Sequence, residues 1–292
     1  MKPGFYPALG TPLDEMGNLV AASLARHVED QIQGGASGLL VMGSMGIQAQ
    51  VKNSEYVKTA RVAVEAANGA CPVMVGVMDN AVARVLDRID SLRGLDISGV
   101  VATTPYYFAM SQAEVIRFFE RVADASPFPV YMYDLPSVTQ TKIAADTCLR
   151  LMAHPNIAGI KTGNLETARR IERAKHAVDP DFVVLFSGLD VFDAAYGYGL
   201  TRQLDGMFAC TTPINARLYD SLAAGDRRAA SEALDRILLL RDTFMRVGVF
   251  AGFSYAMNAL GFPGNFAPDY TPPLSAEQQD EVRQCLKQLK LI

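Results

Sequence analysis

Residues 99–133 contain one complete alternation of the two elements that decide the fold. Gly99-Val100-Val101-Ala102 has the composition of a buried strand, and Val130-Tyr131-Met132-Tyr133 repeats that composition further along the chain. Between them lie apolar residues at the spacing of one helical face: Val115, Phe118, Phe119 and Val122. Two apolar strands joined by an amphipathic helix predict a β-α-β unit with parallel strands.

The same alternation continues through most of the chain. Eight short apolar runs bounded by Gly, Pro or Asp are predicted as strands: Gly4–Leu9, Gly38–Met42, Val73–Val77, Gly99–Ala102, Val130–Tyr133, Ile157–Lys161, Val183–Phe186 and Gly206–Ala209. Apolar strands separated by helices are typical of a parallel sheet covered on its faces, and eight units favour closure into a barrel. No G-x-G-x-x-G follows the first strand, which disfavours a dinucleotide-binding sheet. The sequence therefore predicts an α/β fold of the (β/α)8 TIM barrel type.

The alternation ends after the eighth predicted strand. Three helical stretches follow it: Asp226–Arg246, Val249–Leu260 and Ser275–Leu289. The last of these begins with Ser275 and has Gln278 three residues on, which indicates a capped helix start. We therefore expect one (β/α)8 barrel over residues 1–225 and a C-terminal three-helix extension over residues 226–292.

Composition excludes several classes of partner. The 292 residues include 27 basic and 31 acidic side chains, a net charge of −4, and neither sign forms a block. Nucleic acids and anionic membranes need a basic footprint, so we expect a small-molecule ligand instead. No apolar stretch is long enough for a signal peptide or a membrane span, and a cytoplasmic protein is expected.

Cysteine and histidine spacing gives no indication of a metal site. The four cysteines form no Cys-x-x-Cys pair, and we expect them to be reduced thiols. His27, His154 and His176 lack the mutual spacing of metal ligands, and we expect all three at the surface or at helix ends.

Lys161 is the first candidate for chemistry. It ends the predicted strand Ile157–Lys161, and active sites of (β/α)8 barrels lie at the carboxyl ends of the strands. An apolar wall disfavours the ammonium form, so a neutral amine that attacks ketones becomes accessible. The alternative is a structural lysine paired with a carboxylate, and position alone leaves both open.

Two further strand ends carry groups that suit such chemistry. Imine formation needs a group that moves protons, and the phenol of Tyr133 lies at the end of its strand. Tyr131 points to the same side, so alternation does not choose between them; we favour Tyr133 for its terminal position. Gly43-Ser44-Met45-Gly46 supplies small residues and backbone N–H groups that a carboxylate could approach, although such a turn is often only a turn.

The order of these strand ends resembles the dihydrodipicolinate synthase and N-acetylneuraminate lyase family of Schiff-base aldolases. The motifs are G-S-x-G at 43–46, T-P-Y-Y at 104–107, Y-x-x-P at 133–136 and I-K at 160–161. The segments Thr11-Pro12-Leu13-Asp14 and Gly261-Phe262-Pro263-Gly264 also match, so the resemblance covers essentially the whole chain.

The resemblance implies a role for each matching residue. Lys161 would form an imine with pyruvate or another 2-oxo acid, and Tyr133 would handle the proton. Ser44 would relay protons and hold the carboxylate, while Tyr107 would extend the relay into the site of a neighbouring subunit. Further substrate-binding residues are expected at Gly43, Met45, Gly46, Thr162, Gly188 and Asp190. The resemblance also implies a homotetramer, and a covalent imine that needs neither metal nor external cofactor.

The departures from the family pattern fall where the second substrate would bind. Ile47 replaces the usual glutamate of G-x-x-G-E, and Met45 replaces a hydroxyl residue. Asp134 stands where the family has Asn, and Val138 stands where dihydrodipicolinate synthases have an arginine for the aldehyde's carboxylate. Lys142 is the nearest cation and is expected to be a solvated surface charge. An apolar pocket of this kind indicates a less charged acceptor.

Three functions follow as hypotheses. The first is a lyase or aldolase that makes or cleaves a carbon–carbon bond between a 2-oxo acid and an aldehyde. The second is a 4-hydroxy-tetrahydrodipicolinate (dihydrodipicolinate) synthase or a sugar-acid dehydratase, which uses the same imine. The third is a non-catalytic relative that binds a 2-oxo acid and has lost turnover.

Overall fold

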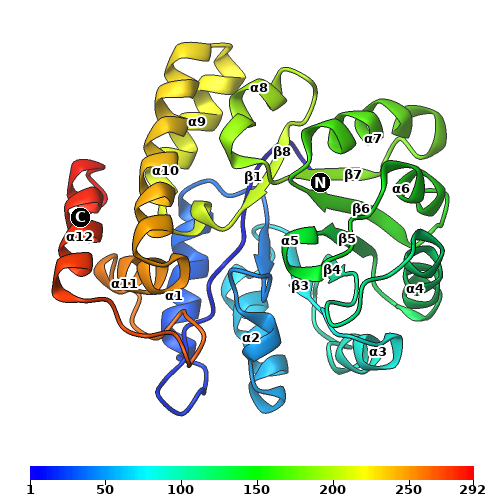
Figure 1. Cartoon of the computed structure of the whole chain (residues 1–292), viewed down its shortest axis with the longest axis horizontal. Coiled ribbons are helices and arrows are strands. Elements are labelled where there is room, and N and C mark those ends of the chain that lie inside the picture. Colours follow the sequence, from blue (N-terminus) through cyan, green and yellow to red (C-terminus); the bar gives the residue numbers. More distant parts are fainter. The chain divides into compact units, whose positions relative to one another are not determined.

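The computed structural model describes residues 1–292, and in it strands and helices alternate along the chain (Figure 1). The strands are β1 (Gly4–Pro7), β2 (Leu39–Val41), β3 (Val73–Gly76), β4 (Gly99–Thr103), β5 (Val130–Asp134), β6 (Ile157–Thr162), β7 (Val183–Phe186) and β8 (Arg202–Asp205). The α-helices are α1 (Ala21–Gln33), α2 (Asn53–Ala67), α3 (Val82–Ser91), α4 (Gln112–Ala125), α5 (Pro136–Thr139), α6 (Ala145–Leu151), α7 (Leu165–Val178), α8 (Phe192–Tyr196), α9 (Thr212–Ala224), α10 (Arg227–Val247), α11 (Val249–Ala259) and α12 (Ala276–Gln288). Three short 3₁₀ helices are η1 (Gln48–Gln50), η2 (Leu189–Val191) and η3 (Met207–Cys210).

The strands form one sheet in the order β1-β8-β7-β6-β5-β4-β3-β2. Ala8, the residue that follows β1, bridges in parallel to Leu40 of β2, and this bridge joins the two ends of that order. Eight strands with intervening helices and three helices after the last unit confirm the predicted (β/α)8 TIM barrel with a C-terminal extension.

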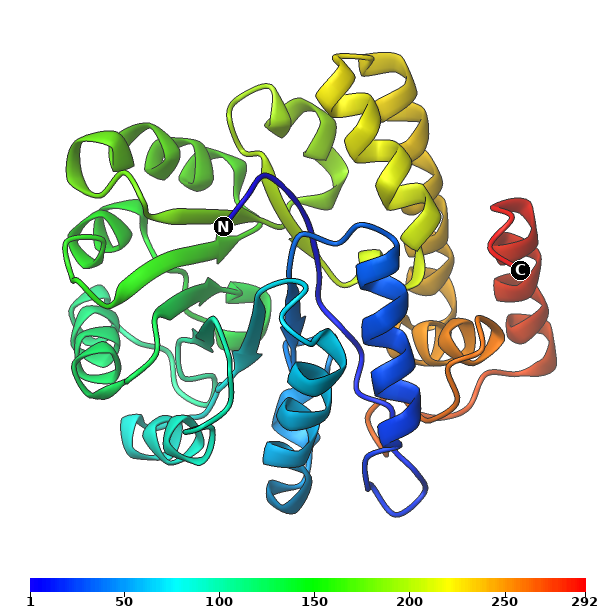
Figure 2. The same cartoon turned by 180° about the vertical axis from the view of Figure 1, so that it is seen from behind.

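The chain divides into two compact units. The first comprises residues 1–4 and 72–204, and the second comprises residues 5–71 and 205–292. In the first unit, β3 to β7 are parallel neighbours, α7 packs on β6 and β7, and α6 lies against α7. In the second unit, α9, α11 and α12 each pack against α10 (Figure 2). A boundary between barrel and extension at residue 225 stays a prediction.

The eighth strand does not lie where hydropathy predicts it. Most of the predicted strand Gly206–Ala209 belongs to the 3₁₀ helix η3, and β8 is Arg202–Asp205. Leu204 is the one apolar residue of β8, so a search for apolar runs does not detect that strand. The apolar residues of η3 are buried by ring packing instead, since Phe208 contacts both Phe5 and Tyr219.

Helix positions follow the apolar patterns closely. All four apolar residues predicted for one face of α4 are buried, and the helix starts with a capping box between Ser111 and Glu114. The three C-terminal helices lie within two residues of their predicted bounds, and Ser275 caps α12 together with Gln278 as expected. None of the helices combines the length and the apolar character that a membrane span requires.

His27 is buried, which contradicts its expected surface position. It lies on the same face of α1 as Leu24 and Gln31, and its side chain is fully inaccessible to solvent. Its Nε2 lies 2.9 Å from the carbonyl oxygen of Ala209, which only accepts, so Nε2 carries the hydrogen and Nδ1 stays without a partner. The other two histidines are surface residues, because His154 pairs with the exposed Asp124 and His176 is exposed.

Burial of His27 makes folding stability depend on pH. Burial lowers the pKa of His27 to about 4 from an ordinary value of 6.5, although the Ala209 carbonyl and the Asp30 charge act in the opposite direction. Between these pH values the unfolded chain therefore binds a proton at His27 that the folded chain does not bind. The contribution of His27 to the free energy of unfolding is complete above pH 6.5 and is lost as the pH falls towards 4.

We predict that His27→Gln flattens the acid side of the stability profile. A neutral amide does not titrate, so the variant should lose less unfolding free energy than the wild type between pH 6.5 and 4, by up to roughly 3 kcal/mol. Urea unfolding at a series of pH values measures this difference, and His176→Gln is the matched control that should keep the wild-type slope. Parallel profiles for wild type and His27→Gln would contradict the prediction.

Candidate active site

Lys161 and Tyr133 are brought together by strand register. Tyr133 of β5 pairs with Lys161 of β6, and Thr103 of β4 pairs with Tyr133 on its other side. Residues in register on parallel strands project to the same face of the sheet. The Lys161 amine accordingly lies over the Tyr133 ring, with Nζ 3.9 Å from the ring centroid, and both side chains are 4% exposed.

Lys161 has no carboxylate partner. It forms neither an ion pair nor a hydrogen bond through its amine, and its one polar contact is the face of the Tyr133 ring. A buried ammonium group is costly to desolvate unless it is paired, and an aromatic face offsets only part of that cost. The paired structural lysine that position alone left open is therefore not the arrangement in this protein.

Tyr131 has a packing role that separates it from Tyr133. Its ring fills the space above two glycines on the neighbouring strands, Gly99 and Gly159. A Cβ at Gly99 would lie 2.6 Å from the ring, and one at Gly159 would lie 2.8 Å from it. Burial also raises the pKa of the Tyr131 phenol, which disfavours ionisation. The geometry thus places Tyr133, and not Tyr131, against the Lys161 amine.

The Thr162 side chain is hydrogen-bonded to Asp134, a residue that stands out in the sequence only because the family usually has Asn there. The Thr162 hydroxyl donates to Oδ2 of Asp134 at 2.9 Å, and the Ile143 N–H donates to Oδ1 at 2.9 Å. Asp134 is 4% exposed and Thr162 is fully buried. This carboxylate therefore connects the carboxyl ends of β5 and β6 to the loop before α6.

The predicted residues Gly43, Ser44, Met45 and Gly46 form one tight turn after β2, in the second unit. The N–H groups of Ile47 and Gln48 donate to the carbonyls of Ser44 and Gly43, whereas those of Met45 and Gly46 make no hydrogen bond in the chain. Gly46 has no room for a side chain, because a Cβ there would lie 2.8 Å from the carbonyl oxygen of Leu9. Two unused N–H groups in a turn are suited to bind an anion.

The residues beside this turn carry local strain and an unpaired amide. Ile47, which replaces the family glutamate, has φ of 45°, a left-handed conformation that is costly for a β-branched residue. Gln48 is 1% exposed, and neither its amide nitrogen nor its amide oxygen has a partner. No motif indicated either feature.

Tyr107 lies in the loop after β4, with 71% of its side chain exposed. Its ring contacts Phe108 edge to face, and its backbone N–H donates to Oδ1 of Asn80, in the loop after β3. Sequence reasoning missed Asn80, because its contact with Tyr107 joins two separate loops and no local pattern indicates it.

The remaining strand-end residues lie near the surface. Gly188 precedes η2, which contains the exposed Asp190. Val138, at the position of the family arginine, is 57% exposed in α5, and Lys142 is exposed as expected.

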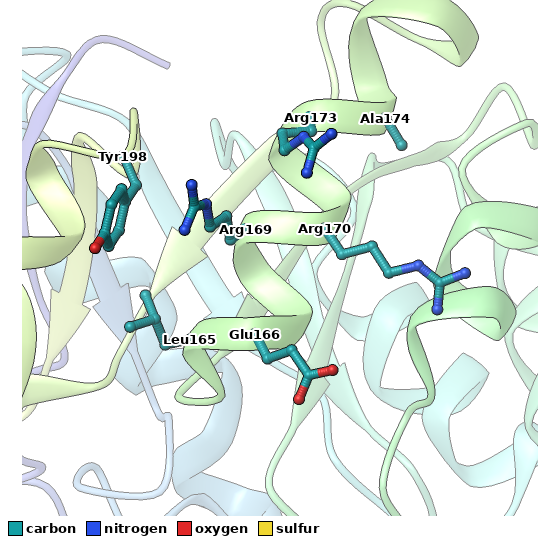
Figure 3. A pocket seen from close by; sticks show the side chains of 7 residues that line it. All are labelled: Leu165, Glu166, Arg169, Arg170, Arg173, Ala174 and Tyr198. Carbon is teal, nitrogen blue, oxygen red and sulfur yellow. The ribbon is translucent and has the colours of Figure 1, made fainter.

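Two surface grooves lie apart from these residues. The larger has a volume of about 960 Å³ and runs along α7, the helix that follows β6. Arg169 faces Tyr198 there, with its guanidinium carbon 4.2 Å from the ring centroid, while Arg170 points the other way (Figure 3). The smaller groove, of about 680 Å³, lies in the second unit and is lined by residues from the segments 13–20, 47–52 and 263–269. None of the predicted site residues lines either groove.

Comparison with known proteins gives matches over the whole chain. The model of the dihydrodipicolinate synthetase family matches residues 2–289. The 4-hydroxy-tetrahydrodipicolinate synthase of Acidiphilium cryptum (strain JF-5) is 30% identical over 293 residues, 99% of this chain and 99% of that protein. The enzyme of the same name from Exiguobacterium sp. (strain ATCC BAA-1283 / AT1b) is 29% identical over 97% of this chain and 100% of its own length.

Solved structures share the fold. Dihydrodipicolinate synthase from Thermotoga maritima superposes with a TM-score of 0.92 at 22% identity, covering 100% of both chains. A prophage protein of the dihydrodipicolinic acid synthase family from Escherichia coli K12, solved in complex with pyruvate, gives 0.90 at 24% identity, again over 100% of both chains.

We predict that Asp134→Asn destabilises the protein even though Asn is the usual family residue. Both Asp134 oxygens accept hydrogen bonds, and an amide offers only one oxygen, so either Ile143 N–H or the Thr162 hydroxyl loses its acceptor. Urea unfolding should show a loss of about 1–3 kcal/mol, the cost of one unsatisfied buried group. Asp146→Asn, at an exposed carboxylate, is the control, and equal stability of the Asp134 variant would refute the prediction.

Proposed function

Because the chain belongs to the dihydrodipicolinate synthetase family, we propose that it is a Schiff-base-forming lyase that makes or cleaves a carbon–carbon bond between pyruvate, or another 2-oxo acid, and an aldehyde. Its enzyme class is that of a carbon–carbon lyase. The observation that carries the proposal is the buried Lys161 amine, which has no carboxylate partner and lies 3.9 Å from the centroid of the Tyr133 ring.

In the proposed mechanism, the Lys161 amine attacks the carbonyl carbon of the 2-oxo acid and gives a carbinolamine. Tyr133 donates a proton to the departing oxygen, water leaves, and an imine remains on Nζ. The protonated imine accepts the electron pair when C3 loses a proton, and the resulting enamine attacks the aldehyde carbon, whose oxygen takes up a proton. Water then hydrolyses the imine, which releases the product and restores the Lys161 amine. Cleavage runs through the same steps in reverse. The imine is the electron sink, so the mechanism needs no external cofactor.

The carboxylate of the 2-oxo acid is proposed to bind the turn at residues 43–46. The N–H groups of Met45 and Gly46 lack acceptors in the chain, and an anion is the ligand that such amides favour. Ser44 and Tyr107 are proposed to carry protons between Tyr133 and solvent. Thr162, Gly188 and Asp190 are proposed to contact substrate from the ends of β6 and β7.

Subunit assembly is proposed on two grounds. The resemblance implies a homotetramer in which Tyr107 serves a neighbouring site, and the 71% exposure of Tyr107 leaves it available for such a contact. Small molecules remain the proposed substrates, and a cytoplasmic location stays a prediction.

A second candidate is the 4-hydroxy-tetrahydrodipicolinate synthase reaction. Full-length relatives near 30% identity carry that name, which favours it. Val138 and the buried Ile47 count against it, because neither offers a charge for the carboxylate of a charged aldehyde. Sugar-acid dehydration uses the same imine and remains an alternative. Measuring pyruvate release or consumption across a panel of aldehydes and sugar acids distinguishes these reactions, and dehydration without pyruvate release would favour the last.

We predict that borohydride traps pyruvate on Lys161. Reduction converts the imine to a stable amine, so mass spectrometry of the protein and of its Lys161 peptide should show one pyruvate-derived adduct per chain. Lys161→Ala should show none, and Lys142→Ala, at an exposed lysine, should label like the wild type. Absence of the adduct in the wild type would refute the imine mechanism. An adduct without turnover on any substrate would instead support the non-catalytic relative.

We also predict that Tyr133→Phe slows proton transfer more than it weakens pyruvate binding. Exchange of the pyruvate methyl hydrogens in D2O, followed by NMR, reports imine formation and C3 deprotonation without any aldehyde. The exchange rate should fall by about 10²–10⁴-fold, the usual contribution of a positioned acid or base. Tyr131→Phe is the matched control, since its ring packs on glycines. An unchanged rate in Tyr133→Phe would remove that phenol from the mechanism.

A further inference from the structure

We propose that Asn80 is a positioning residue for Tyr107: its amide oxygen holds the backbone of the loop after β4 so that the Tyr107 phenol reaches the place where it passes protons. This inference rests on the proposed function, because it gives Tyr107 a part in the reaction. Nothing in the sequence motifs points to Asn80.

The first observation is a pair of hydrogen bonds to one atom. The N–H groups of Tyr106 and Tyr107 both donate to Oδ1 of Asn80, at 3.0 and 2.8 Å. A single side-chain acceptor therefore determines the direction of two successive peptide units. The hydrogen bonds cross from the loop after β3 to the loop after β4, so they are tertiary contacts and not part of a local turn.

The second observation is how little else holds Tyr107. Its side chain is 71% exposed, and its one ring neighbour, Phe108, is itself 74% exposed. Packing of the side chain therefore contributes little to its position. Nearby, Gln140 Nε2 donates weakly to the Tyr106 carbonyl at 3.4 Å, and three residues beyond Tyr107 the Met110 N–H donates to Thr141 Oγ1 at 2.9 Å. The two hydrogen bonds to Asn80 are thus the restraint closest to the phenol.

The third observation is that Asn80 is itself fixed to a rigid base. Its N–H donates to Oδ1 of Asp79 at 2.7 Å. The Asp79 side chain is 4% exposed, and it accepts from Arg84 Nε at 2.6 Å and from Arg88 Nη2 at 3.1 Å. Both arginines lie one turn apart on α3, so the carboxylate is fixed to that helix.

The charge state of Asp79 is consistent with this role. Burial by itself would raise the pKa of Asp79, but the hydrogen bonds from Arg84, the Asn80 N–H and Arg88 outweigh it, and the net pKa is lowered. The carboxylate therefore stays charged at neutral pH. A rigid helix, a charged buried acceptor and a neutral amide oxygen form one continuous support that ends at the Tyr107 backbone.

Precise placement matters more for proton transfer than for pyruvate binding. A misplacement of about 1 Å can cost on the order of 100-fold in rate, whereas the amount of imine present at equilibrium does not depend on how fast the Tyr107 phenol passes protons. Loss of the Asn80 acceptor should therefore lower the rate of methyl-hydrogen exchange in pyruvate and leave the borohydride-trapped fraction unchanged.

The test is a double-mutant cycle on the full-length chain, with exchange of the pyruvate methyl hydrogens as the rate. Asn80→Ala should slow exchange by about tenfold or more, and Asn80→Asp, which keeps an acceptor oxygen, should restore most of it. Adding Asn80→Ala to Tyr107→Phe should cause no further loss, because the phenol to be positioned is already gone. Gln140→Ala, which removes the weak contact, should exchange like the wild type.

Three outcomes would overturn the inference: a wild-type rate in Asn80→Ala, losses from Asn80→Ala and Tyr107→Phe that multiply, or a fully active Tyr107→Phe. If Asn80→Ala proves unstable, Asn80→Ser, whose hydroxyl is too short to reach both N–H groups, takes its place in the cycle. Pyruvate trapping separates this inference from the proposed function. A chain that traps pyruvate on Lys161 but shows any of the three outcomes refutes Asn80 alone, whereas a chain without the adduct refutes the function.

Discussion

The candidate site depends on one constraint: a lysine amine is buried at the end of β6 with an aromatic ring as its only polar contact. Register sets this arrangement, because Tyr133 and Lys161 are paired residues on adjacent parallel strands. A carboxylate here would pair with the amine and make it unavailable for the proposed imine. Burial of the amine without such a partner has a cost in folding, and it leaves the amine open to a ligand.

Hydrogen bonds to side-chain oxygens connect neighbouring segments at the carboxyl ends of the strands. Asp134 connects the ends of β5 and β6, and Asn80 connects the loops after β3 and β4. Each uses an oxygen acceptor to bind a group on the neighbouring segment. Barrel strands supply rigid positions, but the loops that follow them would move independently without such links.

Much of the fold could be predicted from the sequence, because long apolar patterns report burial directly. The helices after the barrel and seven of the eight strands follow such patterns, whereas β8 does not, since Leu204 is its one apolar residue. The surface position predicted for His27 is wrong, because a histidine gives no hydropathy signal of its own. The buried Leu24 on the same face of α1 is the signal that indicates burial there. The lysine and tyrosine could be found from strand ends. Asn80 and the unpaired amide of Gln48 could not, because their importance comes from contacts across loops that no local pattern encodes.

The packing of Tyr131 has a consequence for how this barrel can change. Its ring lies against Gly99 on β4 and Gly159 on β6. A side chain at either glycine would also meet backbone, because a Cβ at Gly99 would lie 2.9 Å from the Pro129 carbonyl oxygen and one at Gly159 would lie 2.5 Å from the Val183 carbonyl oxygen. Removal of the ring alone therefore leaves a cavity that neither glycine can be enlarged to fill. A designer who wishes to reshape the floor beneath the lysine must keep both glycines and replace Tyr131 with a residue of similar volume.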